Sequence, residues 1–209
     1  MARHRKSAGA YHHGDLRRAL LDEALRFVER HGLEALSLRE LARRLGVSPA
    51  APYHHFADRT ALLRELAQQG FVALLESAQR ELEGETEPTR RLHAIGRGYV
   101  RFAIRHPWHY RVMFLPGNQL ENDLATMTES PTFALLRECV IACLDQAGRG
   151  NVDPMPTILA MWGGVHGIVT LWFDGPLSRA VSHDEFEGMA LAAVEVLNRA
   201  VMVPGDRKP

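Results

Sequence analysis

Hydrophobic residues recur every three or four positions along most of this chain, which is the spacing of one face of an α-helix. No segment alternates apolar and polar residues with a period of two over the length of a strand. The pattern therefore predicts an all-α fold. Its first stripe ends at Gly32 and consists of Leu16, Leu20, Leu21, Ala24, Phe27 and Val28.

Glycines, prolines and capping residues divide the pattern into separate helices. After the first helix, further helices are expected at 37–45, 48–55, 58–82, 88–105, 107–115, 131–147, 154–173 and 184–203. We assign residues 1–64 to an N-terminal domain of three helices and residues 65–209 to a larger helical domain. The helix that begins near residue 58 links the two.

The segment 37–56, SLRELARRLGVSPAAPYHHF, has the pattern of a helix-turn-helix unit. Ser37 and Glu40 form an S-x-x-E capping box, and Gly46 tolerates the left-handed backbone that ends a helix. Ser48 is expected to cap the next helix, with Pro49 at its first position. The second helix of such a unit lies in the major groove of DNA.

The first residues of that second helix suit a groove. Ala50 and Ala51 are small enough for the backbone to approach DNA closely, and Tyr53 and His54 reach phosphates or bases. A tight helical hairpin that binds no nucleic acid remains the alternative interpretation of this segment.

Charge is unevenly distributed along a chain whose formal net charge is zero. Residues 1–64 contain 12 Lys and Arg against 7 Asp and Glu, a net charge of +5. A basic N-terminal part of this kind indicates a polyanionic partner, although chance clustering on a helical surface gives the same count. The basic arm Arg3–Lys6 is a further candidate for contact with DNA.

The stretch SLRELARRLGVSPAAPYHHFADRTALLRELAQQGF resembles the DNA-binding domain of TetR-type transcriptional regulators. The resemblance implies a three-helix bundle from about Tyr11, with Arg39 and residues 50–54 facing the groove. It also places Ser37, Tyr53, His55 and Arg59 near the DNA backbone. Ala50 and Ala51 depart from the polar residues often found there, so specificity would depend on Arg39, His54 and DNA shape.

The C-terminal half contains a candidate dimer interface. Gly163 and Gly167 leave one helix face without side chains, and the apolar face of the last helix is wider than one core contact needs. Two such helices from each subunit would form a four-helix interface, as in TetR-type proteins; packing within one chain is the alternative. The predicted interface residues are Gly163, Gly167, Phe186, Met189, Ala190, Ala193 and Leu197.

An effector pocket is predicted between the helices of the larger domain. Aromatic walls with a few polar groups suit a small, largely apolar ligand, and plain core packing is the alternative. The candidate lining residues are Tyr99, Phe102, Trp108, Met113, Phe114, Phe133, Trp162 and His166. The pattern Trp162–His166–Gly167, with HPWHYRVMF at 106–114, also resembles one C-terminal subclass of the TetR family.

Other functional classes have weaker signals. Cys139 with Cys143 and His106 with His109 contain metal-binding atoms, but their spacing is not that of a zinc knuckle. No phosphate-binding loop or nucleophile motif is present, so neither catalysis nor a cofactor is expected. The apolar run 160–173 is too short to span a bilayer, so no membrane partner is expected and we expect a cytoplasmic protein.

Together these features predict a homodimeric regulator that binds a near-palindromic DNA operator, acts as a repressor and is released by a small apolar effector. A metal sensor, a ligand-independent architectural protein and an enzyme remain the alternatives.

Overall fold

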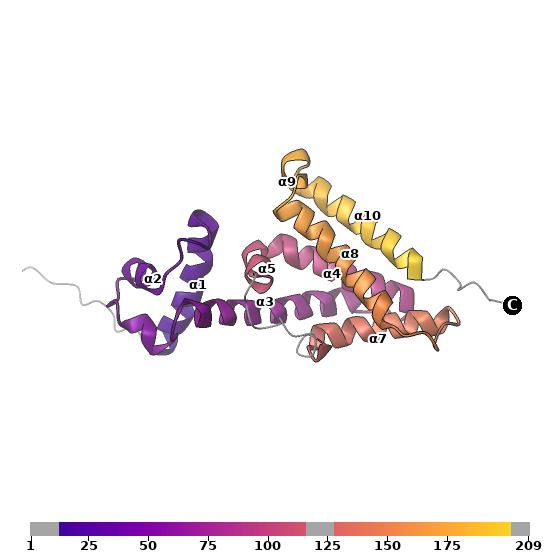
Figure 1. Ribbon diagram of the computed structural model, residues 1–209, viewed down its shortest axis with the longest axis horizontal. Coiled ribbons are helices and arrows are strands. Elements are labelled where there is room, and N and C mark those ends of the chain that lie inside the picture. The colour runs from indigo at the N-terminus through magenta and orange to yellow at the C-terminus, as the bar shows by residue number, and fades with distance from the viewer. Residues whose placement is uncertain (1–12, 116–127, 202–209) are drawn as a thin grey trace, which may run out of the picture. The chain divides into compact units, whose positions relative to one another are not determined.

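A computed structural model of the chain describes residues 13–115 and 128–201, and these residues form helices with no strand among them (Figure 1). The predicted all-α fold is confirmed. The helices are α1 His13–His31, α2 Leu38–Leu45, the 3-10 helix η1 Ala51–His54, α3 Arg59–Leu82, α4 Pro88–Arg105, α5 Pro107–Met113, α7 Pro131–Gln146, α8 Met155–Phe173, α9 Leu177–Ala180 and α10 His183–Val201.

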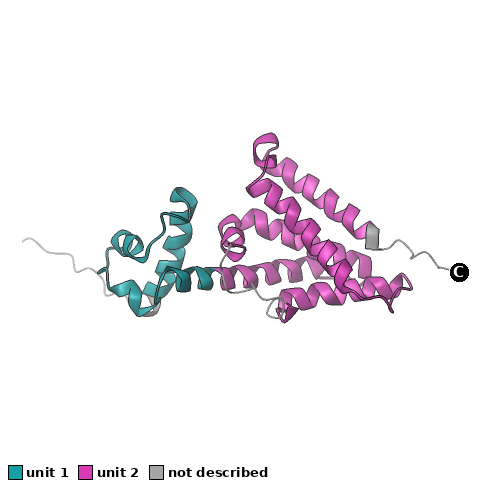
Figure 2. Cartoon of the chain, viewed as in Figure 1, with its two compact units in different colours: residues 1–66 teal, residues 67–209 magenta. Residues whose placement is uncertain are grey.

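The chain divides into two compact units, Met1–Leu66 and Ala67–Pro209, and the boundary falls within α3 (Figure 2). The basic arm Arg3–Lys6 lies outside the described residues.

The N-terminal unit is built on the buried stripe of α1. Leu20, Ala24 and Val28 are completely buried and pack in one core with Leu41 and Ala42 of α2, which are equally buried. Ala42 is small, so the two helices can lie close together at this point.

The turn after α2 follows the expected chemistry. Gly46 has a φ of 67°, in the left-handed region that glycine adopts without a steric cost. The N–H of Val47 donates to the carbonyl oxygen of Ala42 at 3.0 Å, which satisfies one of the free carbonyls at the helix end.

The element after the turn differs from the prediction of a helix over 48–55. It is a single turn of 3-10 helix, in which Tyr53 N–H donates to Ala50 O at 3.1 Å. Pro52 explains the difference, because it is buried and has no N–H to donate to Ser48, which an α-helix would require. The N-cap position of this turn is Ala50 and not the predicted Ser48, and no side-chain hydrogen bond caps it.

In the C-terminal unit, α4 packs against α7, α8 and α10 (Figure 1). Glycine lets helices approach closely where α4 meets α3: a Cβ on Gly98 would lie 2.6 Å from the Cα of Ala78. The neighbouring Ser77 hydroxyl donates to the carbonyl oxygen of Gly98 at 2.9 Å. The short helix α9, between α8 and α10, was not predicted.

Candidate nucleic-acid interface and internal cavity

The residues predicted to contact DNA reach the surface of the N-terminal unit. Ser37, Arg39, Ser48, Ala50, Tyr53 and His54 are exposed, while Ala51, His55 and Arg59 are half-buried. Tyr53 is 47% exposed although it is a large aromatic residue, and the adjacent Phe56 is buried in the core. The exposed tip therefore consists of the helix-turn-helix positions that the sequence indicated.

Glu40 holds two of the neighbouring arginines. Its carboxylate accepts hydrogen bonds from Arg43 at 2.6 and 2.8 Å and from Arg44 at 3.1 Å. The Arg43 hydrogen bond, reinforced by the charges of both arginines, lowers the pKa of Glu40 to about 2. Arg44 also contacts Glu23 at 3.4 Å, so these two cations are partly neutralised within the unit.

Arg17 is likewise committed, since it forms an ion pair with Glu65 at 2.9 Å and lies over the ring of Phe56. Arg39 differs from these residues. It is exposed, and no ion pair or side-chain hydrogen bond engages it within residues 13–115 and 128–201. Arg39 is thus an available cation beside the exposed tip.

The side chain of Arg59 is half-buried in the N-terminal unit. Its Nη2 donates to the carbonyl oxygen of Leu33 at 2.8 Å, and its Nε is buried without a partner. The side chain therefore ties the start of α3 to the loop after α1. The predicted phosphate contact of Arg59 stays a prediction, and only the rest of its guanidinium is available for it.

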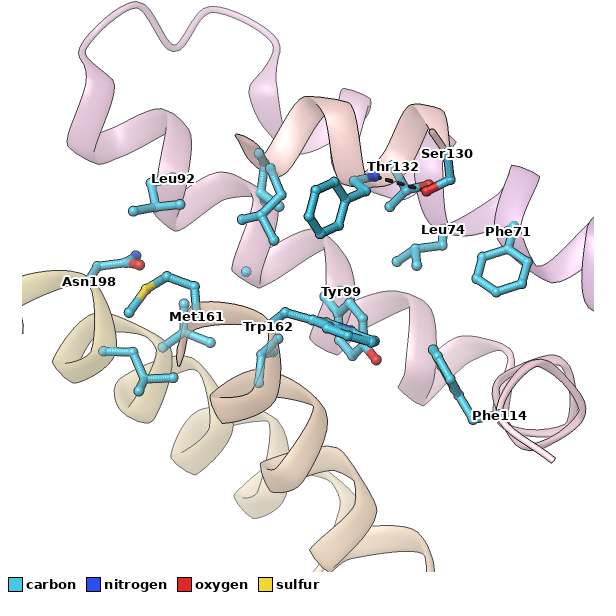
Figure 3. A pocket seen from close by; sticks show the side chains of 17 residues that line it. Phe71, Leu74, Leu92, Tyr99, Phe114, Ser130, Thr132, Met161, Trp162 and Asn198 are labelled. Carbon is cyan, nitrogen blue, oxygen red and sulfur yellow. Dashed lines mark hydrogen bonds between the residues drawn. The ribbon is translucent and has the colours of Figure 1, made fainter. Parts of the chain in front are cut away.

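An apolar cavity of about 80 Å³ lies inside the C-terminal unit (Figure 3). Tyr99, Phe114, Phe133 and Trp162 line it, as the sequence predicted. The sequence did not indicate Phe71, Ser130, Thr132, Val194 or Asn198, which line it as well.

The other predicted pocket residues are not in the wall. Phe102 is completely buried in the core, and Met113 packs on Gly70, where a Cβ would lie 2.5 Å from its sulfur. Trp108 stacks under the guanidinium of Arg111, 4.9 Å from the ring centroid. His166 is likewise not among the lining residues, and a role of these four residues in ligand binding stays a prediction.

His166 anchors a polar cluster behind Tyr99. Its Nδ1 lies 2.9 Å from the hydroxyl of Tyr99 and 3.0 Å from that of Tyr110. Nδ1 offers one lone pair, and Tyr110 has a second partner in Thr170 Oγ1 at 3.3 Å. Burial lowers the pKa of His166, which favours the neutral imidazole near pH 7.

Helices α8 and α10 carry an exposed apolar face. Exposed fractions are 46% for Leu159 and 50% for Leu171 on α8, and 50% for Met189 and 66% for Val196 on α10. A Cβ on Gly163 or Gly167 would meet nothing within 4 Å.

Three of these exposed residues, Leu159, Met189 and Val196, lie on one side of the helix pair. Gly164 of α8 packs against Leu197 of α10, and the two helices run antiparallel (Figure 1). In an antiparallel pair, the residues that directly precede a contact on each helix point to the same side. Gly163 and Val196 precede this contact, and Leu159 and Met189 lie one and two turns away on the same helix faces.

The predicted interface set is only partly exposed. Phe186 and Ala190 are each 1% exposed, and Phe186 stacks on Trp172 with ring centroids 4.4 Å apart. Both belong to the core of the chain, which corrects their assignment to a subunit interface. Leu197 is half-buried in the cavity wall, while Ala193 is half-buried on α10.

The candidate metal ligands do not form a site. Within the described residues, no group of three or more His, Cys, Asp or Glu side chains is placed to hold an ion. Cys139 and Cys143 are completely buried, and burial, together with the neighbouring Cys139, raises the pKa of Cys143 to about 11. They are therefore protonated thiols, whereas a metal binds the thiolate.

Helix α8 is also, by length and composition alone, the one helix in the described residues apolar enough to cross a membrane. One such helix is weak evidence for a membrane protein, since the core helix of a soluble protein meets the same criterion.

The exposed tip after a glycine turn, on a small helical unit joined to a larger one, defines the class of helix-turn-helix DNA-binding proteins. A family model described as bacterial regulatory proteins, tetR family, matches residues 20–66. A second, described as Tetracyclin repressor-like, C-terminal domain, matches residues 92–194. The chain belongs to the TetR family of transcriptional regulators.

Similar proteins agree with this assignment. An uncharacterized HTH-type transcriptional regulator of Mycobacterium tuberculosis is 25% identical over 186 residues, covering 88% of this chain and 82% of that protein. The solved structure of a protein of unknown function from Rhodococcus sp. RHA1 is 32% identical, with a TM-score of 0.68 over 93% of this chain and 100% of that one.

The fold is also shared with PfmR, a TetR family transcriptional regulator from Thermus thermophilus, at 24% identity and a TM-score of 0.65. That alignment covers 86% of this chain and 97% of PfmR. Among sequence relatives, YobS of Bacillus subtilis is aligned over a shorter part, 59% of its length. The narrower resemblance of Trp162–His166–Gly167 to one C-terminal subclass stays a prediction.

Proposed function

We propose that this TetR-family regulator acts as a cytoplasmic homodimeric repressor whose affinity for a near-palindromic operator is lowered by a small, largely apolar effector. The proposed DNA contacts are supported by the exposed tip, which consists of Ala50, Tyr53 and His54 and lies beside the exposed guanidinium of Arg39. In this proposal Arg39 and His54 contact base edges, and Ser37, Tyr53 and His55 contact the DNA backbone.

Dimerisation is proposed through the apolar face of α8 and α10. Leu159, Leu171, Met189 and Val196 would leave water there, and Gly163 would let the partner helix approach closely. This also accounts for the apolar composition of α8, because a helix that is apolar on all sides is normally covered on all sides. Two copies related by a two-fold axis would present two DNA-binding domains to an inverted repeat in the DNA.

The cavity is proposed as the effector site because it shares walls with that interface. Met161, Trp162 and Val165 of α8 and Val194 and Leu197 of α10 line the cavity, while other faces of the same helices form the apolar surface. A ligand that displaces these helices would change the spacing of the two DNA-binding domains in the dimer. It weakens DNA binding to the extent that it prefers the displaced arrangement.

The alternatives lack a comparable supporting observation. A metal sensor would need ligands other than the buried thiols of Cys139 and Cys143. A ligand-independent architectural protein would have no use for the cavity. An enzyme would need a reactive group at the cavity, whose polar groups among the described residues are an amide, three hydroxyls and an indole N–H.

The test is a mobility shift with the DNA upstream of the chain's own gene, repeated across a panel of neutral and charged metabolites. We expect a discrete complex that at least one apolar compound dissociates. If no compound alters operator affinity while the protein stays folded, the effector role of the cavity is wrong and only the DNA-binding role stands.

A further inference from the structure

Asn198 places an unsatisfied hydrogen-bond donor in the wall of the cavity. The residue is 5% exposed, and its side-chain Nδ2 has no hydrogen-bond partner among the described residues. The amide lies at one end of the cavity beside Leu92 and Met161, whereas Phe71 and Phe114 lie at the opposite end (Figure 3). A buried donor without a partner costs free energy that a suitable acceptor recovers.

The hydroxyl groups of the lining are already engaged or lie elsewhere, and the one other side-chain donor among the described lining residues is the indole N–H of Trp162. The hydroxyl of Tyr99 bonds to His166, and Ser130 Oγ accepts from the N–H of Phe133 at 3.2 Å as the cap of α7. Ser130 and Thr132 lie at the start of α7, away from the amide of Asn198 (Figure 3). A water beside Asn198 would meet Leu92 and Met161, which offer it no second polar partner.

The described lining contains no charged side chain, since every lining residue is apolar, aromatic, a hydroxyl residue or Asn198. A carboxylate or an ammonium group bound here would be buried without a counter-ion, which is strongly unfavourable. The lining therefore discriminates against ions and favours an uncharged ligand.

We propose that the cavity binds a neutral, largely apolar molecule with one carbonyl-type acceptor, which receives a hydrogen bond from Asn198 Nδ2. This assignment rests on the proposed role of the cavity as the effector site. The apolar body of the ligand extends from Asn198 towards Phe114.

The size of the cavity links this ligand to movement. A cavity of about 80 Å³ is smaller than the engineered cavity of roughly 150 Å³ that holds benzene. A ligand with an aromatic ring or a longer chain needs more room than this cavity offers, and the lining side chains that would have to move to make that room include Trp162 of α8 and Leu197 of α10.

Three probes with one carbon skeleton test the assignment: butyrophenone, which has a carbonyl, butylbenzene, which has no polar group, and 4-phenylbutyrate, which is an anion. Dissociation constants are measured with the full-length protein at pH 7.5 by calorimetry and by the change in tryptophan fluorescence. For the wild type we expect 4-phenylbutyrate to bind at least about tenfold more weakly than butyrophenone.

The contribution of Asn198 is isolated by the variant Asn198→Leu, which keeps the number and branching of the side-chain heavy atoms and removes the amide. The preference for butyrophenone over butylbenzene, as a ratio of dissociation constants, should fall about 3- to 10-fold in this variant. Asn151→Leu, the same substitution at an exposed position outside the cavity, should leave the ratio unchanged.

If the ratio of dissociation constants for butyrophenone and butylbenzene is unchanged in Asn198→Leu, the proposed hydrogen bond from Asn198 is wrong. If the wild type binds 4-phenylbutyrate more tightly than butyrophenone, the assignment of a neutral ligand is wrong. In both cases the probes still bind, and the effector cavity itself stands. If the folded wild type binds none of the three probes, this assignment of the ligand is wrong. The proposed function would still stand if another compound in the metabolite panel released the protein from its operator. The wild-type comparison requires no variant, so a folding defect in Asn198→Leu cannot conceal the result.

Discussion

Single side chains decide which cations of the N-terminal unit are available to DNA. The sequence contains a ring of arginines around the helix-turn-helix, but carboxylates hold Arg17, Arg43 and Arg44. Arg39 is exposed and unpaired within the described residues, so it has the most freedom to enter a groove. Spacing along a helix accounts for the pairing of Arg43 and Arg44 with Glu40. It does not reveal that Glu65 pairs with Arg17, because these two residues come from different elements.

Replacing Arg39 tests its role in base recognition. Arg39→Ala should weaken binding to the operator by about tenfold or more, with a much smaller loss on random DNA, because an arginine on a base edge contributes roughly 1–3 kcal/mol of discrimination. The measurement is a pair of fluorescence-anisotropy titrations at one salt concentration. Arg179→Ala, the same charge change on exposed α9, should alter neither titration. Equal losses on both DNAs would show that Arg39 contacts only phosphate.

Among the elements, helix ends and the buried stripe of α1 were predictable, whereas the division of a wide apolar helix between core, cavity and surface was not. Ser37 and Gly46 mark the bounds of α2 by capping chemistry that is local in sequence. The 3-10 turn departs from the predicted helix because Pro52 cannot donate the hydrogen bond that an α-helix requires at this position. Phe102 and Phe133 are both aromatic residues on apolar helices, and only the packing of several helices decides that Phe133 lines the cavity.

The apolar faces of α10 likewise could not be assigned to core or surface from the sequence. Phe186 and Val196 both continue its hydrophobic pattern, yet one is in the core and the other is 66% exposed. A wide apolar stripe predicts that two surfaces are covered without indicating which residues belong to which surface.

The pKa of Glu40 makes the stability of the α2 region sensitive to acid. Its folded pKa of about 2 lies below the 4.5 of an unperturbed glutamate, because Arg43 donates hydrogen bonds to the carboxylate. Glu40 therefore stabilises the fold above about pH 4.5, and this contribution disappears as the pH falls towards 2.

Urea denaturation followed by circular dichroism at several pH values measures this effect. Between pH 4.5 and 2 the wild type should lose stability more steeply than Glu40→Gln, which has no carboxylate to protonate. Glu34→Gln, at an exposed position in the loop after α1, serves as the control. Parallel pH profiles for wild type and Glu40→Gln would contradict this account.

At the scale of the whole molecule, the account depends on pairing through α8 and α10. Gly163→Trp should raise the dissociation constant of the dimer by at least about tenfold, or 1.4 kcal/mol, because an indole would occupy the space left for the partner helix. The fold of the monomer should survive, since a Cβ at Gly163 meets no atom within 4 Å.

Sedimentation equilibrium measures the change, and Ile141→Trp on the exposed face of α7 is the matched control. The wild type and Ile141→Trp should remain dimers at micromolar concentration. A dimer unaffected by Gly163→Trp would move the interface away from α8.

The central claim is that two copies of this chain read an inverted repeat, and selection from a random duplex DNA library tests it most directly. The full-length protein is used to enrich bound duplexes over several rounds, and the recovered DNA is sequenced. We expect a near-palindrome whose half-sites are related by a two-fold axis and separated by about one helical turn, roughly 10 base pairs, or a multiple of it. Recovery of a single unrepeated site, or of no common sequence at all, would contradict the account.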